Sequence, residues 1–182
     1  MSKKYQVIYA DPPWPEKGHY KTTKGAKDHY NLMTWKELEK LPVHDIVSPD
    51  GCVLFLWCPY RHLPKALTVL DIWGFEYKTI GFVWVKVTKH KPTRLIYGPG
   101  YYTGSNTEPC FIATSGRVPI PEIDGNKQVV IEPRRAHSQK PDEIAKRIEQ
   151  MYKSLSKIEL FARKKRKGWQ VWGDEVKSDT RL

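Results

Sequence analysis

The chain has 182 residues, 40% hydrophobic and 12% aromatic, which is enough for one folded domain over residues 1–182 and argues against a disordered segment. No apolar run approaches the length of a membrane span, and residues 1–4 lead into a predicted strand without the apolar core of a signal peptide. The net charge of +11 suits a partner rich in phosphate, although an ordinary basic soluble protein can carry the same excess.

An apolar run at residues 5–10 predicts a buried first strand, and Asp11-Pro12-Pro13-Trp14 follows it directly. Both prolines lack an N–H and fix φ, so the chain turns stiffly and presents a carboxylate, carbonyl acceptors and an indole. Those groups suit a flat exocyclic amine, whose two N–H bonds need acceptors and whose ring can stack. Composition alone fits a proline-rich loop with a surface aspartate and an anchoring tryptophan equally well.

The remaining elements alternate between strands and helices. Residues 15–30 have no period and predict a loop that closes over the site. The predicted helices cover residues 34–41, 60–73 and 141–152, and the predicted strands cover residues 52–57, 77–87, 110–114, 128–131 and 157–161. This alternation predicts an α/β fold with a mostly parallel sheet flanked by helices. Ligands bind beyond the carboxyl ends of such strands, so we expect Asp11 and Arg163 to line one cleft.

Cys52, Cys58 and Cys110 lie in or beside apolar stretches, which predicts reduced core residues in a cytosolic protein. No spacing of cysteine and histidine indicates zinc, and no metal is expected. The location would be the cytoplasm for a prokaryotic or phage protein and the nucleus for a eukaryotic one.

Asp-Pro-Pro-Trp after a first strand resembles the catalytic motif of the MT-A70 family of adenine-N6 methyltransferases. Further blocks resemble the family in the family's order over nearly the whole chain, at residues 30–34, 51–57, 84–86, 137–143, 157–163 and 168–173. The resemblance implies a Rossmann-like, S-adenosylmethionine-dependent methyltransferase fold. Its order is permuted, with the catalytic motif first and the cofactor strand last.

The same resemblance implies roles for individual residues. Asp11 and the Pro12 carbonyl would accept hydrogen bonds from the adenine N6, beside Pro13, and Trp14 with Tyr30 would stack on the flipped base. The cofactor S-adenosyl-L-methionine would be held by Ala10, Asp11, Lys140, Phe161, Arg163, Gly173, Asp174 and Glu175. Lys140 would meet the cofactor carboxylate, although it can also be a plain helix-start residue. The family often has an amide at the position of Asp174.

Two basic segments are candidates for nucleic-acid contact. Residues 163–167 are five consecutive cations, and the loop at residues 89–106 mixes cations with tyrosines. The predicted substrate contacts are Tyr30, Trp84, Lys86, Tyr101, Tyr102, Lys164 and Lys165. The ordinary alternative for the cation run is a solvated surface. The ordinary alternative for the tyrosines is that they pack on their own loop.

These features predict an adenine-N6 methyltransferase that acts on nucleic acid after the base leaves its stack. DNA is favoured over RNA because the chain is short and has no zinc finger or additional RNA-binding module. The alternatives are an RNA adenine-N6 methyltransferase, a non-catalytic nucleic-acid-binding member of the family and an N4-cytosine enzyme of the same fold. The family includes homodimers and heterodimers, so either arrangement is compatible with the sequence.

Overall fold

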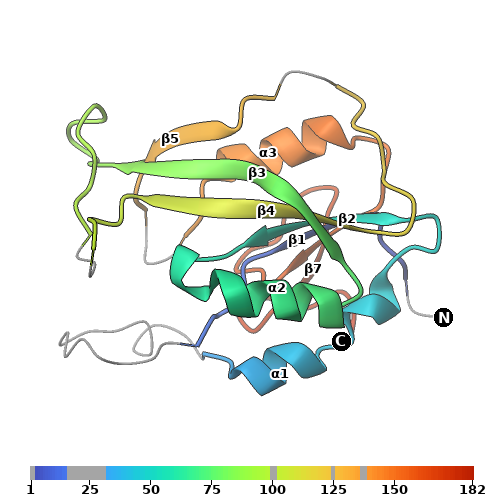
Figure 1. Ribbon diagram of the computed structural model, residues 1–182. Helices are drawn as coiled ribbons and strands as arrows, with labels where there is room; N and C mark the ends of the chain where they lie inside the picture. Colours follow the sequence, from blue (N-terminus) through green and yellow to red (C-terminus); the bar gives the residue numbers. More distant parts are fainter. Residues whose placement is uncertain (1–2, 16–31, 99–101, 124–125, 136–138) are drawn as a thin grey trace.

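The computed structural model describes residues 3–15, 32–98, 102–123, 126–135 and 139–182 (Figure 1). Its strands are β1 Val7–Ala10, β2 Cys52–Trp57, β3 Glu76–Val87, β4 Thr107–Ser115, β5 Val129–Pro133, β6 Lys157–Leu160 and β7 Gln170–Trp172. Its helices are α1 Trp35–Lys40, α2 Leu63–Ile72 and α3 Asp142–Met151, with 3-10 turns η2 Val43–Ile46 and η3 Tyr60–His62.

The strands form one sheet in the order β5-β3-β4-β2-β1-β6-β7. Strand β4 is antiparallel to both of its neighbours, and every other neighbouring pair is parallel. The mostly parallel α/β sheet expected from the sequence is therefore confirmed. Strand β1 lies between β2 and β6, which the chain reaches at very different points in the sequence.

Helices α1 and α2 cover one face of the sheet and α3 covers the other (Figure 1). Side chains of the central strands alternate between the two faces, as strand geometry requires. Ile8 and Leu54 pack with α1 and α2, whereas Val7 and Phe55 pack with α3. Because both faces are covered, β1 and β2 are apolar throughout, which explains their uninterrupted hydrophobic runs.

The start of α1 follows the predicted capping pattern. The Thr34 side chain accepts a hydrogen bond from the Glu37 backbone N–H, and the Glu37 carboxylate accepts one from the Thr34 N–H. The predicted helix at residues 60–73 begins instead as η3 and becomes α-helical at Leu63. The three cysteines are free and buried, as predicted.

Three of the differences from the sequence prediction matter for the site. Strand β4 begins at Thr107, so Glu108 is a strand residue. Strand β6 ends at Leu160, because Phe161 has φ 58° and turns the chain in the left-handed region. Strand β7 was not predicted, since three residues are too short for a period to show.

The carboxyl ends of the parallel strands lie at one edge of the sheet, together with the amino end of β4. This edge therefore brings together Asp11 after β1, Glu108 at the start of β4 and Phe161 after β6. Within the described residues, no helix is both long and apolar enough to cross a membrane.

Candidate active site

The turn after β1 is held by its own backbone. The Trp14 N–H donates to the Pro12 carbonyl at 2.8 Å, and the Met33 N–H donates to the Pro13 carbonyl at 3.0 Å. A carbonyl oxygen has two lone pairs, so each of these oxygens can accept one further hydrogen bond. The turn is rigid because the prolines fix φ and because residues beyond the loop pin its carbonyls.

Trp14 anchors this turn from the inside, which differs from the stacking role predicted from the sequence. Its side chain is only 6% exposed, and its indole N–H donates to the Trp57 carbonyl at 2.9 Å. Its ring lies 5.5 Å from the ring of Trp35 and stacks at 6.3 Å on His62. Burial, with the nearby Arg61 charge, lowers the pKa of His62 to about 4, so this ring is neutral at pH 7.

A chain of four charged groups runs through the site. The Lys140 ammonium lies 2.8 and 2.9 Å from the two oxygens of Asp11 and 3.1 Å from an oxygen of Glu108. The other Glu108 oxygen lies 2.9 Å from the Lys86 ammonium. Lys140 also lies over the Trp57 ring, 5.5 Å from its centroid. Two carboxylates and two ammonium groups balance one another, which allows all four charges at a largely buried place.

The pKa shifts follow from burial and from these partners. Burial raises the pKa of Asp11, the Lys140 ammonium lowers it and the Glu108 charge raises it, so that the net shift is upward. Burial would also raise the pKa of Glu108, but Lys140 and Lys86 outweigh it and the net shift is downward. Burial disfavours the charged form of Lys140, yet its two carboxylate partners raise its pKa above the ordinary value. Lys140 is therefore protonated at neutral pH.

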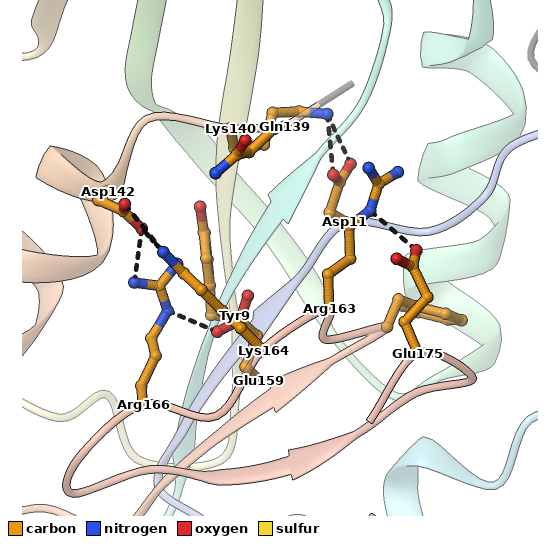
Figure 2. Close-up of a pocket in the computed structure, with 11 residues that line it drawn as sticks. Tyr9, Asp11, Gln139, Lys140, Asp142, Glu159, Arg163, Lys164, Arg166 and Glu175 are labelled. Atoms are coloured by element: carbon orange, nitrogen blue, oxygen red, sulfur yellow. Dashed lines mark hydrogen bonds and ion pairs between the residues drawn. The ribbon is translucent and has the colours of Figure 1, made fainter. Parts of the chain in front are cut away.

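Asp11 and Lys140 stand at one end of a cavity of about 280 Å³, shown in Figure 2. That volume is close to the lower end of the range of about 300–1,000 Å³ for small-molecule sites. The lining residues are Tyr9, Asp11, Gln139, Lys140, Asp142, Glu159, Phe161, Arg163, Lys164, Arg166 and Glu175. They come from β1, the start of α3, β6 and the segments after β6 and β7, which meet at the carboxyl edge of the sheet.

At the opposite side of the cavity, Asp142 binds three cations, of which Lys164 and Arg166 are drawn in Figure 2. Its carboxylate lies 2.8 Å from Lys164, 2.8 Å from Arg166 and 2.7 Å from Arg135. Burial opposes its charge, but hydrogen bonds from these cations hold the pKa of Asp142 well below its usual range. Arg166 also donates to Glu159 at 2.7 Å. Asp142 thus joins the start of α3 to the segment after β6.

The cation run at residues 163–167, a candidate for nucleic-acid contact with Arg163 also a predicted cofactor residue, is divided between the cavity and the surface. Arg166 is largely buried and lies in the cavity wall with Lys164, whereas Lys165 pairs with Asp179 at 2.6 Å outside the lining. Arg163 lies 3.3 Å from Glu175, so that the segments after β6 and β7 meet across the rim. The sequence showed the five charges but not their partners.

The predicted cofactor residues divide into two groups. Asp11, Lys140, Phe161, Arg163 and Glu175 line the cavity. Ala10, Gly173 and Asp174 are absent from the lining formed by the described residues.

Ala10 is fully buried in β1 and Asp174 is exposed. Gly173 has a packing reason, because a Cβ there would lie 2.5 Å from the Ala162 carbonyl oxygen. Its N–H already donates to the Ser178 hydroxyl at 3.1 Å.

The predicted substrate residues are also dispersed. Trp84 is buried and donates its indole N–H to the Glu132 carbonyl at 2.9 Å, so it is a core residue in the structure. Lys86 lies over the Trp84 ring and pairs with Glu108. Tyr102 is exposed, while Tyr30 and Tyr101 lie outside the described residues.

Sequence reasoning missed Glu108, Asp142, Glu159 and Arg166 as members of the site. Glu108 had been placed between a loop and a strand. Asp142 and Glu159 lie in blocks that resemble the family and Arg166 lies in the cation run, but none of the three had been assigned to the cavity. A further signal was that these are charged residues in or beside apolar elements, where a charge needs a partner.

The lining suits S-adenosylmethionine by the chemistry of its groups. That molecule carries an ammonium, a carboxylate and two ribose hydroxyls, and it has no phosphate. The cavity offers carboxylates from Asp11, Glu159 and Glu175 for the ammonium and the hydroxyls, and cations from Lys140 and Arg163 for the carboxylate. Phe161 adds an apolar wall. The residues therefore fit the cofactor that the sequence resemblance implies.

Comparison with known proteins agrees with this geometry. Type II methyltransferase M.MunI of Mycoplasma sp. is 36% identical over 96% of this chain and 78% of its own length. The N(6)-adenosine-methyltransferase catalytic subunit METTL3 of Homo sapiens is 29% identical over 88% of this chain but only 26% of its own length. An MT-A70-like N(6)-adenosine-methyltransferase of Arabidopsis thaliana is 27% identical over 94% of this chain and 24% of its own length. The MT-A70 family model matches residues 5–175, and the chain therefore belongs to the MT-A70 family.

Proposed function

We propose that this chain transfers the methyl group of S-adenosylmethionine to the N6 amino group of adenine in DNA. Adenine-N6 methyl transfer is the activity that family membership implies. The observation that supports it best is the joint placement of Asp11, Lys140 and Glu108 at one end of a polar cavity. Both Asp11 and Lys140 are present and in contact, which favours catalysis over a purely nucleic-acid-binding role.

Asp11 acts on the target amine. Its carboxylate accepts a hydrogen bond from N6, and the remaining lone pair of the Pro12 carbonyl accepts the second. Together they orient the nitrogen and increase the electron density on it, although its lone pair is otherwise delocalised into the ring. The bound cofactor would supply the methyl group that N6 accepts, and the Asp11 carboxylate would take the proton that N6 then gives up. Asp11 need not be a strong base, because the amine becomes acidic only once it is methylated.

Lys140 is a positioning residue in this proposal. Its ammonium contacts both Asp11 oxygens and one Glu108 oxygen, so it fixes the rotation of the Asp11 carboxylate. It also favours the ionised form of Asp11, because its charge lowers the pKa that burial raises. A contact between Lys140 and the cofactor carboxylate, as the sequence resemblance implies, would have to replace one of these three contacts, because an ammonium has three donors.

The cofactor supplies an electrophilic sulfonium methyl when it is bound. The cavity beside Asp11 would hold it, with Glu175 and Arg163 at the rim and Phe161 as an apolar wall. Glu159 and Arg166 neutralise each other in the same lining, so their pair can orient a polar group without adding net charge.

DNA is favoured as the substrate by the pattern of similarity. The chain has higher identity to the type II methyltransferase and covers 78% of its length. It covers only about a quarter of the N(6)-adenosine-methyltransferases, whose names specify the ribonucleoside. We also propose that residues 1–182 form a single methyltransferase domain.

The test is a direct substrate comparison. The protein is incubated with methyl-labelled S-adenosylmethionine and with DNA or RNA of identical sequence, in single-stranded and duplex forms, and label in the polymer is counted. We expect label in DNA, with Asp11→Asn as the inactive control. Label in RNA alone would overturn the DNA assignment and keep the chemistry.

A further inference from the structure

The connection between β3 and β4 projects beyond the sheet on the left of Figure 1, and its base is ordered. The Ile96 N–H donates to the Lys86 carbonyl at 2.9 Å, and the Lys86 N–H donates to the Asn106 carbonyl at 2.8 Å. Further out, the Ser105 N–H donates to the Gly98 carbonyl at 2.7 Å. The two sides of the connection are thus held together beyond the ends of both strands.

Tyr97 lies at the base of this connection, and its ring is both exposed and in contact with the chain. Its side chain is 79% exposed, yet one side of its ring lies against Gly104. A Cβ at Gly104 would lie 2.7 Å from both Cδ2 and Cε2 of the ring, so any residue other than glycine at this position would displace the ring. A Cβ at Gly98 would similarly lie 2.5 Å from the Ser105 carbonyl oxygen. Two glycines therefore allow a close-packed base that holds one edge of an otherwise exposed aromatic ring.

The surroundings of Tyr97 are strongly basic. Lys89, His90, Lys91 and Arg94 are all exposed in the same connection. No aspartate or glutamate occurs anywhere between Val87 and Thr107 in the sequence. A held aromatic ring among exposed cations is the combination that binds single-stranded nucleic acid, where bases stack and phosphates meet positive charge.

The base of this connection is joined to the catalytic turn. Lys86 accepts and donates the backbone hydrogen bonds that hold the connection, and its ammonium pairs with Glu108. Glu108 in turn contacts Lys140, which contacts Asp11. Lys86 therefore links the base of this connection to the ion pairs that include Asp11.

We infer that Tyr97 is a stacking site for an unpaired base that neighbours the target adenine in a single strand. The inference rests on the proposed function and adds a substrate form to it. Tyr101 and Tyr102 are the predicted contacts in the same connection; Tyr101 lies outside the described residues, and Tyr102 is 99% exposed. Stacking on a ring that is already held loses less side-chain freedom, so Tyr97 is the better site.

The experiment measures binding and turnover with a single-stranded oligonucleotide that contains one adenine, made as DNA and as RNA. Tyr97→Ala should weaken binding by about 5- to 150-fold, the effect of losing one base–aromatic stack. The KM for the oligonucleotide should rise while kcat is kept, because Tyr97 does not touch the reacting atoms. Tyr97→Phe should bind like wild type, and the salt dependence should not change because no phosphate contact is lost.

Two further variants separate stacking from a change of structure. Gly104→Ala keeps the aromatic ring but displaces it, so it should weaken binding in the same direction as Tyr97→Ala. Tyr77→Ala is the matched control, because this exposed tyrosine lies near the start of β3, roughly 33 Å from the other end of that strand. It should leave binding unchanged.

An abasic nucleotide placed next to the adenine, on each side in turn, locates the stacked base. At one of the two positions, the abasic site should lower the affinity of wild type for the oligonucleotide as much as Tyr97→Ala does. The same abasic site should not lower the affinity of Tyr97→Ala any further. The inference would be overturned if Tyr97→Ala bound the oligonucleotide as well as wild type does, or if Tyr97→Phe lost as much affinity as Tyr97→Ala. It would also be overturned if the effects of the abasic site and of Tyr97→Ala on affinity were additive at every position. Failure of wild type to bind any single strand would overturn it too. If wild type methylates neither polymer, the proposed function fails instead, whatever Tyr97 does.

Discussion

Replacing Lys140 with methionine removes the ammonium that Asp11 and Glu108 share but keeps most of the side-chain volume. The Lys140 side chain is only 9% exposed, and its ammonium makes three contacts of 2.8 to 3.1 Å. Glu108 keeps its pair with Lys86, whereas Asp11 loses its nearest cation. Breaking a buried ion pair costs about 3–5 kcal/mol, and we expect the lower end because water reaches part of Asp11.

The effect on the reaction should be larger than the effect on cofactor binding. Without Lys140 the Asp11 carboxylate can rotate, and loss of alignment of this kind costs on the order of 10²-fold in kcat. The pKa of Asp11 is raised by burial and lowered by Lys140, so it should rise further in the variant. Because the ionised carboxylate is the active form, the acid limb of the kcat profile should move to higher pH.

The assay combines pH–rate profiles, calorimetry with S-adenosylhomocysteine and urea unfolding. Lys146→Met is the matched control, since Lys146 is exposed on α3 close by. If only the dissociation constant for S-adenosylhomocysteine rises, while kcat and its pH profile stay unchanged, Lys140 does not position Asp11. It would then serve the cofactor carboxylate alone, as the sequence suggested.

Four other predictions follow from the same contacts. Asp11→Asn should lower kcat by about 10²–10³-fold and leave affinity for S-adenosylhomocysteine nearly intact, and near-normal turnover would contradict its assigned role. Trp14→Ala should destabilise the fold by about 3–5 kcal/mol in urea unfolding, as expected for a buried anchor and not for a surface stacking residue. Arg166→Ala should weaken binding of S-adenosylhomocysteine in calorimetry, while Lys165→Ala should not. Equal dissociation constants for the two variants would contradict the placement of Arg166 in the cofactor cavity. The lowered pKa of Asp142 means that its charge stabilises the fold above about pH 4, the ordinary aspartate pKa, and that this contribution is lost as pH falls further. Asp142→Asn should therefore be less stable than wild type at pH 7, with the difference shrinking at pH 3, and a constant difference would be inconsistent with the ion pairs.

Local patterns in the sequence determined much of the fold. The apolar runs of β1 and β2 identified buried strands, and the Thr34–Glu37 capping box located the start of α1. Family motifs then ordered these elements into the permuted fold. Strand β7 was not predicted because a strand of three residues has no measurable period. The sequence also does not show that Gly173, which follows this strand, packs on Ala162.

The site was less predictable because its contacts are long-range. Lys140 and Asp11 are 129 positions apart, and no spacing rule connects them. Glu108 looked like a loop residue until β4 was seen to begin at Thr107. Trp14 could be assigned to stacking or to anchoring from its motif, and only the Trp57 carbonyl as its partner decides for anchoring.

The central claim concerns the atom that receives the methyl group, and analysis of the modified nucleoside tests it most directly. DNA incubated with the protein and S-adenosylmethionine is digested to nucleosides, which are separated and identified by mass spectrometry. The account predicts N6-methyldeoxyadenosine with wild type and about 10²–10³-fold slower formation of it with Asp11→Asn. A methyl group on cytosine N4, or the same yield of N6-methyldeoxyadenosine from Asp11→Asn, would contradict it.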